Sequence, residues 1–443
     1  MARAAALLVA LVLAWLLGQT AAPEAAFRST ALAIGVALVA AALVGRIAER
    51  IGLPRVTGYL VFGLLCGPSI ANIITRPMAR ELQIVNGLAV TLIAFVAGLE
   101  MNLRRLAPRL TVIARVGGVT ILLTYLMIFV AVWTAWPWLR IAPGFTGIHR
   151  LAASALLTAL VASFSPTVSI AIVAEARAAG PFTELTLAIV ILADLVLILA
   201  FTLIMQFVRV TFGTAAHVSL FAGVTWEIFG SFAFGALAGG VLALYLAHIG
   251  REVAIVVLGF CVVIAGVAEH FQLEPLMAAL AAGLVVENLA PSAGDVVKEG
   301  VERSALPVLV VFFAAAGASL QLDALATLGW IALGVAAART GAIWISARLG
   351  RAAAGLSDEV TAMTWMALVS QAGVTLGLTL IVAAEFPGWG TTIETLMLAL
   401  IALHQLIGPV LYRAALARAG EIGRQAGTPT ALMMPQSPSG AAR

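Results

Sequence analysis

The stretch LAIVILADLVLILAF, residues 187–201, decides the class of fold, because it holds one charged side chain, Asp194, in an otherwise apolar run. A helix needs about 20 mainly apolar residues to cross the hydrocarbon core of a bilayer, and the apolar segment around Asp194 extends over residues 182–208. Polar and apolar residues do not alternate with period two, which excludes a strand of a membrane barrel. The stretch therefore predicts a transmembrane helix with an acid near its centre.

The rest of the chain has the same character. Of the 443 residues, 62% are hydrophobic and 10% are charged, which is too little polar surface for a water-soluble globule of this size. We expect an all-α polytopic membrane protein of about thirteen transmembrane helices, since lipid admits only helices or closed barrels. The predicted spans are 31–47, 55–75, 82–101, 111–136, 150–176, 182–208, 222–247, 253–269, 274–289, 303–320, 325–350, 360–384 and 390–415.

The basic residues indicate the orientation of the chain. The net charge is +4, but Lys and Arg are spread over many short loops, which does not favour nucleic acid as a partner. With the mature N-terminus outside, 17 of the 25 basic residues lie on the inner side and six on the outer side, and Arg3 and Arg339 make up the rest. Cytoplasmic loops retain Lys and Arg. We therefore expect a multi-pass protein of the cell inner (plasma) membrane with a cytoplasmic C-terminus.

Three regions follow from this pattern. Residues 1–25 contain an apolar run from Ala4 to Leu17 and the small-residue stretch QTAAPEAA, which fits a cleaved signal peptide or an extra helix that stays attached. Residues 26–416 form the membrane domain. Residues 417–443 are predicted to be a short, disordered cytoplasmic tail without a nucleotide-binding domain. Cys66 and Cys261 both lie in apolar runs, which favours neither a disulfide nor a metal site, and no cofactor is expected.

A weak internal repeat predicts the topology. Predicted helix three ends in GLEMNLRRL (98–106) and helix ten in GASLQLDAL (317–325), where Gly, Leu, Leu and a side-chain amide recur in register. One helix earlier in each half, GYLVFGLLCGP (58–68) is similar to MAALAAGLVVEN (277–288). Both pairs are seven helices apart, so the second copy crosses the membrane in the opposite direction. Such inverted-topology repeats are typical of secondary transporters, whose sites lie where discontinuous helices meet.

The repeat relates helix five to helix twelve, and both carry polar breaks. Helix five contains SFSPTVS (163–169), where Pro166 removes a backbone donor and the hydroxyls of Ser163, Ser165, Thr167 and Ser169 can bind a cation or the helix backbone. Helix twelve contains SQAGVTLG (370–377), with Gln371, Gly373 and Thr375 near its centre. We expect two discontinuous helices that cross at a binding site.

Two charges lie well inside predicted spans. A charge at the centre of a bilayer costs about 2.5–3.5 kcal/mol on insertion scales, so Asp194 is a candidate to hold a proton and a metal cation in alternation. A neutral acid bonded to a neighbour, or half of a structural ion pair, remains the alternative for Asp194. Arg339 is permanently cationic and fits pairing with helix ends or a carboxylate, with snorkelling to the inner face as the alternative. Glu175 is expected at the membrane interface, with the lining of an inner vestibule as the alternative.

Several of these motifs together resemble a known family. In chain order they are GLPRVTGYLVFGLLCGP, FVAGLEMNL, SFSPTVS, AEARAAGPFTELTLAIVILADLVLIL, MAALAAGLVVEN, VLVVFFAAAGASLQL, ARTGAIW and SQAGVTLGL. Their order and spacing over residues 31–415 resemble the monovalent cation:proton antiporter superfamily, particularly the branch that includes the potassium-efflux antiporters. The resemblance implies a transporter, not an enzyme, that exchanges Na+ or K+ for H+ by an elevator-type movement, as a homodimer of protomers with a scaffold and a mobile core.

The resemblance also assigns the site residues. Asp194 corresponds to the ion- and proton-binding aspartate, which holds the transported metal cation, and Ser165 to Thr167 correspond to the unwound segment that helps to bind it. The stretch from Gln371 to Gly373 corresponds to the crossing partner, and Arg339 to the basic residue of the core.

One position departs from the family pattern. Ala193 stands where family members usually carry Asp, Asn or Gln. With one acid in place of two, we expect electroneutral exchange. The same departure leaves other classes open, namely a non-transporting sensor or accessory subunit and an organic-anion symporter of similar fold. An intramembrane protease is disfavoured, because no span carries GxSxG or a paired aspartate motif.

Overall fold

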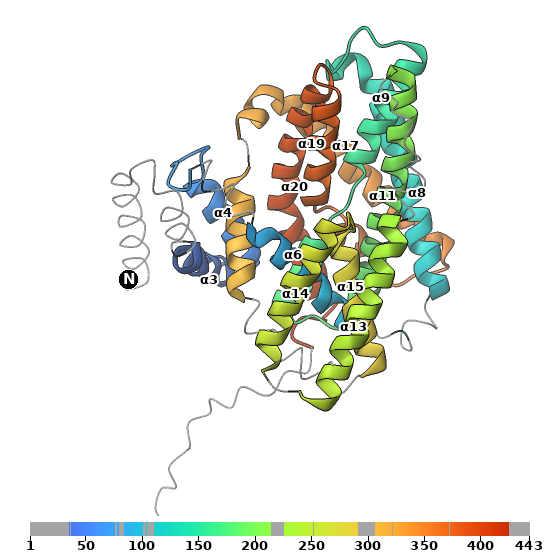
Figure 1. Ribbon diagram of the computed structural model, residues 1–443. Coiled ribbons are helices and arrows are strands. Elements are labelled where there is room, and N and C mark those ends of the chain that lie inside the picture. Colours follow the sequence, from blue (N-terminus) through green and yellow to red (C-terminus); the bar gives the residue numbers. More distant parts are fainter. Residues whose placement is uncertain are drawn as a thin grey trace, which may run out of the picture.

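The computed structural model describes residues 35, 37–75, 78, 84–100, 103, 110–213, 226–250, 252–290, 306–320, 322–371 and 373–424 (Figure 1). Within these residues every regular element is a helix and none is a strand, which confirms the predicted all-α class. The predicted signal peptide or extra helix at 1–25 and the tail beyond Arg424 lie outside the described residues.

Seven helical segments in the described part are long and apolar enough to cross a membrane. They are α8 (Leu110–Leu139), α9 and α10 together (Gly147–Val161 and Pro166–Ala176), α11 (Pro181–Phe212), α13 (Ser231–His248), α14 (Val253–His270), α17 (Leu322–Ala353) and α20 (Gly390–Arg418). Shorter apolar helices are α4 (Arg55–Cys66), α6 (Ile84–Glu100), α15 (Pro275–Leu289), Leu306–Ala318 and α19 (Gly373–Glu385), and a further short helix is α3 (Ala42–Arg50).

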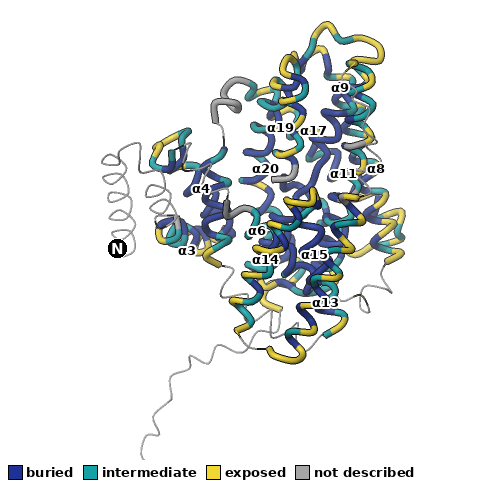
Figure 2. Tube along the Cα trace, viewed as in Figure 1, coloured by how far each residue is buried: buried dark blue, intermediate teal, exposed yellow. Residues whose placement is uncertain are grey.

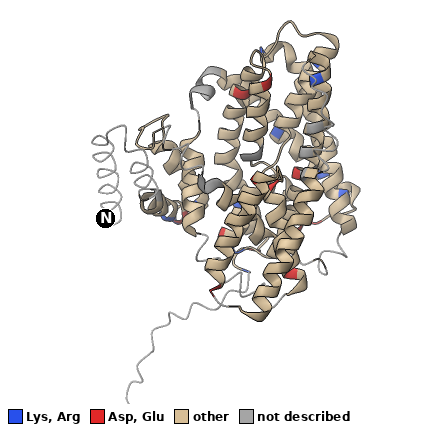
Figure 3. Cartoon of the chain, in the orientation of Figure 1, with Lys and Arg blue, Asp and Glu red and all other residues tan. Residues whose placement is uncertain are grey.

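Each of the thirteen predicted segments thus contains a helix, although several differ in extent. The segment expected at 55–75 ends as a helix at Cys66, where Gly67 and Pro68 follow and the chain turns with a bond from the Ile74 N–H to the Cys66 carbonyl at 2.7 Å. The segment expected at 360–384 is divided into α18 (Thr364–Ala367) and α19. Charged residues are sparse along the described helices (Figure 3).

The predicted repeat appears as close helix crossings at glycines. A Cβ atom added at Gly63 in α4 would lie 2.0 Å from the Ala314 carbonyl oxygen in the helix Leu306–Ala318. A Cβ atom at Gly317 of that helix would lie 2.1 Å from the Leu60 carbonyl oxygen in α4. Both positions therefore require glycine for the backbones to approach so closely.

The same arrangement recurs between α6 and α15. A Cβ atom at Gly98 in α6 would lie 2.3 Å from the Leu280 carbonyl oxygen, and one at Gly283 in α15 would lie 2.1 Å from the Phe95 carbonyl oxygen. In the sequence repeat Gly98 corresponds to Gly317, and the run containing Gly63 corresponds to the run containing Gly283. Each copy therefore packs its helices on those of the other copy in the same way, as a two-fold relation between inverted repeats requires.

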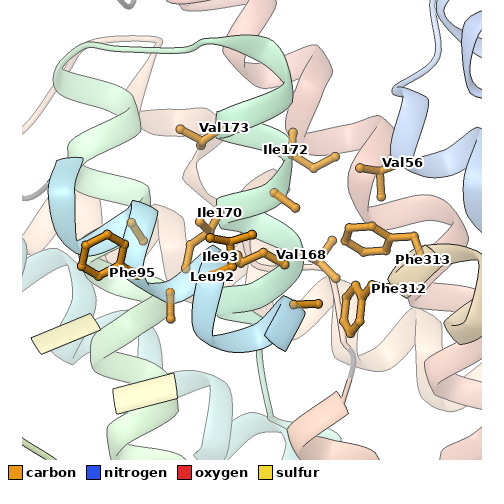
Figure 4. Packing of buried hydrophobic residues seen from close by; sticks show 14 of the residues in the cluster. Val56, Leu92, Ile93, Phe95, Val168, Ile170, Ile172, Val173, Phe312 and Phe313 are labelled. Atoms are coloured by element: carbon orange, nitrogen blue, oxygen red, sulfur yellow. The ribbon is translucent and has the colours of Figure 1, made fainter. Parts of the chain in front are cut away.

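The described helices form two regions, and α10, the second half of the fifth predicted helix, lies between them. In Figure 1, α9, α11, α17, α19 and α20 fill the upper part of the molecule and α13, α14 and α15 the lower part. The interior between the helices is buried (Figure 2). In Figure 4, Val168 and Ile170 of α10 lie beside Leu92 and Ile93 of α6, in one buried cluster. The broken helices are thereby held at the centre of the fold.

Candidate functional site

The break in helix five is formed by the residues between α9 and α10. Helix α9 ends at Val161 and α10 starts at Pro166, which occupies the first helical position, where its missing N–H costs no hydrogen bond. Ser165 caps α10, because its hydroxyl accepts a bond from the Val168 N–H at 3.3 Å. The side chains of Ser165 and Thr167 are both buried. The sequence SFSPTVS thus breaks the helix where predicted.

The break in helix twelve crosses the first break and is bonded to it. The Gln371 amide nitrogen donates to the carbonyl oxygens of Leu160 and Val161, at 3.3 and 3.1 Å, and to the Ser163 hydroxyl at 3.0 Å. The hydroxyls of Ser163 and Thr375 lie 2.6 Å apart. Gly373 begins α19, and residue 372 before it lies outside the described residues. The structure therefore brings Ser163, Gln371 and Thr375 into one hydrogen-bonded group.

Arg339 of α17 joins the two breaks through backbone carbonyl groups. Its side chain is fully buried. The guanidinium donates to the carbonyl oxygens of Val161 at 2.7 Å and Ser163 at 2.6 Å in the first break, and of Val369 at 2.7 Å and Leu368 at 3.4 Å in the second. These carbonyl groups lie at or just after the C-terminal ends of α9 and α18, where the helix dipole gives a partial negative charge. A cation at this point satisfies acceptors that neither broken helix can satisfy itself.

Asp194 lies in α11 at the level of this crossing. Its neighbour Ala193 belongs to a buried apolar cluster that also contains Phe164 from the first break and Leu368 from the second. The side chain of Asp194 is 2% exposed, and its Oδ1 atom has no hydrogen-bond partner in the described part of the chain. No hydrogen bond links Asp194 to Ser163, Ser165 or Thr167 among the described residues. The carboxylate is close to the crossing but is not part of its hydrogen-bond network.

Two further carboxylates bind helix N-termini at the edge of this region. Glu175, at the end of α10, accepts the backbone N–H groups of Arg55 and Val56 in α4 at 2.5 and 2.9 Å and lies 3.4 Å from Arg413 of α20. The sequence predicts Glu175 at the membrane interface, but no pattern in the sequence indicates its hydrogen bonds to α4. Its position couples three helices.

Glu421 makes the corresponding contact at the start of α11. The carboxylate accepts the backbone N–H groups of Phe182 and Thr183 at 2.9 and 2.8 Å and the Thr183 hydroxyl at 2.7 Å. A Cβ atom added at Gly180 would lie 2.4 Å from this carboxylate, so the turn before α11 requires glycine. Residues 417–424, expected to begin a disordered tail, continue α20 to Arg418 and then bind the core through Glu421.

The described residues contain no group of three or more His, Cys, Asp or Glu that could hold a resident metal ion. Candidate oxygen ligands for a cation are the Asp194 carboxylate, the hydroxyl groups of the first break and the Gln371 amide oxygen, which is buried and has no hydrogen-bond partner among the described residues. Buried oxygen ligands of this kind suit alkali cations, which are hard ions. The arrangement can therefore hold one cation or one proton at a buried acid beside two interrupted helices.

Comparisons with known proteins agree with this geometry. A family model described as "Sodium/hydrogen exchanger, transmembrane" matches residues 34–413. Two structures of the sodium proton antiporter MjNhaP1 from Methanocaldococcus jannaschii are similar to this chain at 20% identity. The structure at pH 8 has a TM-score of 0.67 and covers 89% of this chain and 98% of that one. The electron-microscopy structure has a TM-score of 0.70, with coverages of 88% and 97%. No curated protein matches the sequence.

Proposed function

Since this chain belongs to the sodium/hydrogen exchanger family, and is thus a multi-pass membrane transporter that exchanges cations for protons and not an enzyme, we propose that the exchange takes place at Asp194. The cation is Na+ or K+, and one proton moves against one cation. The protein works as a homodimer in the plasma membrane with its C-terminus in the cytoplasm. Na+ is the cation named by the family description and by the similar antiporter structures.

The observation that carries this proposal is the buried Asp194 carboxylate, whose Oδ1 atom has no hydrogen-bond partner among the described residues. A carboxylate in apolar surroundings is stable only when a proton or a cation neutralises it. One negative site cannot hold both at once, so proton and cation compete for it. Competition at a site that opens alternately to the two sides of the membrane gives exchange.

The first break supplies further ligands of the cation. Ser163 is already engaged with Gln371 and Thr375 and also donates to the Leu160 carbonyl at 2.8 Å. Its hydroxyl therefore holds the crossing together. The hydroxyls of Ser165 and Thr167 bind the cation. The Ser165 hydroxyl accepts one backbone hydrogen bond, at 3.3 Å. Pro166, which lies between them, has no backbone N–H to donate and thereby keeps the helix interrupted at this point.

The proposed stoichiometry rests on position 193. Ala193 is buried and apolar, so α11 offers one acid at the site where a polar neighbour would offer two groups. A single carboxylate binds either one proton or one monovalent cation, and the exchange is therefore electroneutral.

Transport moves a core against a scaffold in an elevator-like manner. The core consists of α8 to α11 and α17 to α20, and the scaffold of α3, α4, α6, α13 to α15 and the helix Leu306–Ala318. The bonds from the α4 backbone to Glu175 cross the boundary between them and must break when the core moves. Glu175→Gln is expected to change the turnover rate and to leave the apparent affinity for the cation unchanged.

Proteoliposomes with an internal pH dye test the proposal. Wild-type protein should show pH changes driven by Na+ or K+, and Asp194→Asn should abolish them. Asp358→Asn is the matched control, because Asp358 is exposed and caps the turn at Thr361. Normal exchange by Asp194→Asn would contradict the assignment of the site. Absence of exchange by the wild type with Na+, K+ and Li+ would favour a sensor or a symporter instead. Exchange unaffected by a valinomycin clamp is expected if it is electroneutral.

A further inference from the structure

The side-chain oxygen of Gln371 is a buried acceptor without a hydrogen-bond partner in the described part of the chain. Gln371 lies in the second break, and its side chain is 0% exposed. The amide nitrogen donates to the Leu160 and Val161 carbonyl oxygens and to the Ser163 hydroxyl. A carbonyl oxygen has no hydrogen to donate, so the Gln371 oxygen cannot take the place of its nitrogen at these contacts. The amide therefore has one orientation, with its oxygen on the edge away from these carbonyl groups.

The acceptors of this amide nitrogen all have another hydrogen-bond partner. The Leu160 carbonyl accepts the Ser163 hydroxyl at 2.8 Å. The Val161 carbonyl accepts the Arg339 guanidinium at 2.7 Å. The Ser163 hydroxyl lies 2.6 Å from that of Thr375. The nitrogen is thus not required to satisfy a buried acceptor at the crossing. Its bonds fix the direction of the amide, whose unpaired oxygen has capacity for a ligand.

The backbone just before this glutamine is held from two sides. The Arg339 guanidinium donates to the carbonyl oxygens of Leu368 and Val369. On the side of α20, a Cβ atom added at Gly408 would lie 2.2 Å from the Ser370 hydroxyl oxygen, so the two segments are in close contact. Both the backbone and the amide group are therefore fixed in place before any ligand binds, which lowers the cost of binding one.

A fixed amide oxygen suits a transported alkali cation, because hard cations prefer oxygen ligands. Ala193 offers no such oxygen next to Asp194, and it lies in one buried cluster with Phe164 of the first break and Leu368 of the second. Helix α11 thus packs against both breaks beside its acid. The Gln371 amide is neutral and does not take up a proton near neutral pH, whereas a carboxylate binds either ion. Such a ligand favours the cation in its competition with the proton.

We infer that Gln371 binds the transported cation through its side-chain oxygen, and that this neutral ligand sets the affinity of the site for the cation without changing its affinity for the proton. The inference rests on the proposed exchange at Asp194. It adds a ligand from the second break to the hydroxyl groups that the first break supplies.

Two substitutions at this position separate the role of the oxygen from that of the nitrogen. Gln371→Met and Gln371→Glu both lose the amide nitrogen, and only Gln371→Glu keeps an oxygen. In proteoliposomes, Gln371→Met should raise the KM for Na+ or K+ about tenfold, because a polar group that binds a charge contributes strongly. The factor should be the same at every pH, since the proton affinity of Asp194 does not change. Gln371→Glu should keep a KM at or below that of the wild type at alkaline pH, where its own carboxyl group is ionised.

The melting temperature in detergent measures cation binding independently of transport. Gln371→Met should need about tenfold more Na+ or K+ than the wild type for the same rise of the melting temperature. Gln206→Met is the matched control. The Gln206 side-chain oxygen is also buried and lacks a partner among the described residues, but it belongs to a residue about 18 Å along α11 from Asp194. This control should keep the KM of the wild type.

A wild-type KM in Gln371→Met would overturn the inference. An equally raised KM in Gln371→Glu at alkaline pH would also overturn it, because loss of the nitrogen would then account for the effect, and this outcome can be read even if Gln371→Met does not fold. If Asp194→Asn abolishes exchange while Gln371→Met behaves as wild type, only the role of Gln371 fails. If Asp194→Asn exchanges normally, the proposed function itself fails.

Discussion

Arg339 and Asp194 are opposite charges buried beside the same helix crossing, and their surroundings differ. The Arg339 guanidinium donates to four backbone carbonyls from both breaks. Asp194 has an oxygen atom without any hydrogen-bond partner among the described residues. A buried charge with all its partners in place stabilises the fold, whereas one that lacks partners has capacity for a ligand. The comparison favours a structural role for Arg339 and supports the proposed exchange at Asp194.

The carboxylates of the core sharpen this contrast. Glu421 accepts three hydrogen bonds at the start of α11, and Glu385 at the end of α19 accepts two from Arg209 at 2.6 and 2.7 Å. Both lie toward the ends of helices that meet at the crossing. Asp194 is thus distinguished from these acids by its missing partners as well as by its depth. The following substitutions test whether stability follows the partners, as the comparison requires.

The largest effect is expected for Arg339→Met, which removes the guanidinium donor from four carbonyl groups at the crossing, of which Val161 keeps the Gln371 amide as a donor. Each buried carbonyl left without a donor costs about 1–3 kcal/mol, so the variant should unfold at a much lower temperature in detergent. Arg348→Met is the control on the same helix, where the exposed guanidinium lies over the Trp344 ring. Arg339→Lys should fall between them, because an ammonium group cannot reach all four carbonyls. Equal melting temperatures for the Arg339 and Arg348 variants would contradict the structural role.

Glu421→Gln should have the next largest effect on stability. The amide keeps one acceptor oxygen but loses the charge at the N-terminus of α11, and charge-assisted bonds of this kind contribute about 1.5–3 kcal/mol. The melting temperature should therefore fall, by less than in Arg339→Met. Glu359→Gln, at an exposed position in the loop before α18, is the control. A melting temperature equal to that of the control would show that the bonds to Phe182 and Thr183 do not stabilise the start of α11.

Much of this arrangement could be predicted from the sequence. Pro166 among hydroxyl residues indicated the first break, and its repeat relation indicated the second. The Gly, Leu and side-chain amide positions that recur seven helices apart indicated the inverted repeats. Asp194 and Arg339 were conspicuous because charges are rare in apolar spans. All of these signals come from residue types whose physical preferences are strong.

The partners of these residues could not be predicted in the same way. Arg339 binds carbonyl oxygens of Val161, Ser163, Leu368 and Val369, and backbone acceptors leave no mark in a sequence. Glu421 falls in a segment that resembles a flexible tail in composition, and its role depends on where α20 ends relative to α11.

Within the first break, Ser163 and Ser165 are expected to behave differently. Ser163→Ala removes the hydroxyl that bonds Gln371 and Thr375, so it should lower stability by about 1–3 kcal/mol. Ser165→Ala removes a cap with one long bond and should cost about 1 kcal/mol or less. Transport should show the reverse order, with a larger rise of the cation KM in Ser165→Ala. The same order in both measurements would remove the distinction between a structural and a ligand-binding hydroxyl.

The smallest effect on stability is expected for Asp194→Asn, although it abolishes exchange. The substitution removes a charge that costs about 2.5–3.5 kcal/mol at the centre of a membrane, and it breaks no hydrogen bond to Oδ1, so the melting temperature should stay the same or rise. Added cation sharpens the test. At ten times its Kd a bound cation stabilises the folded state by about 1.4 kcal/mol, so Na+ or K+ should raise the melting temperature of the wild type and leave that of Asp194→Asn unchanged. Equal stabilisation of both proteins would place the cation elsewhere, and a strong destabilisation by Asp194→Asn would show that this carboxylate, like Arg339, holds the fold together.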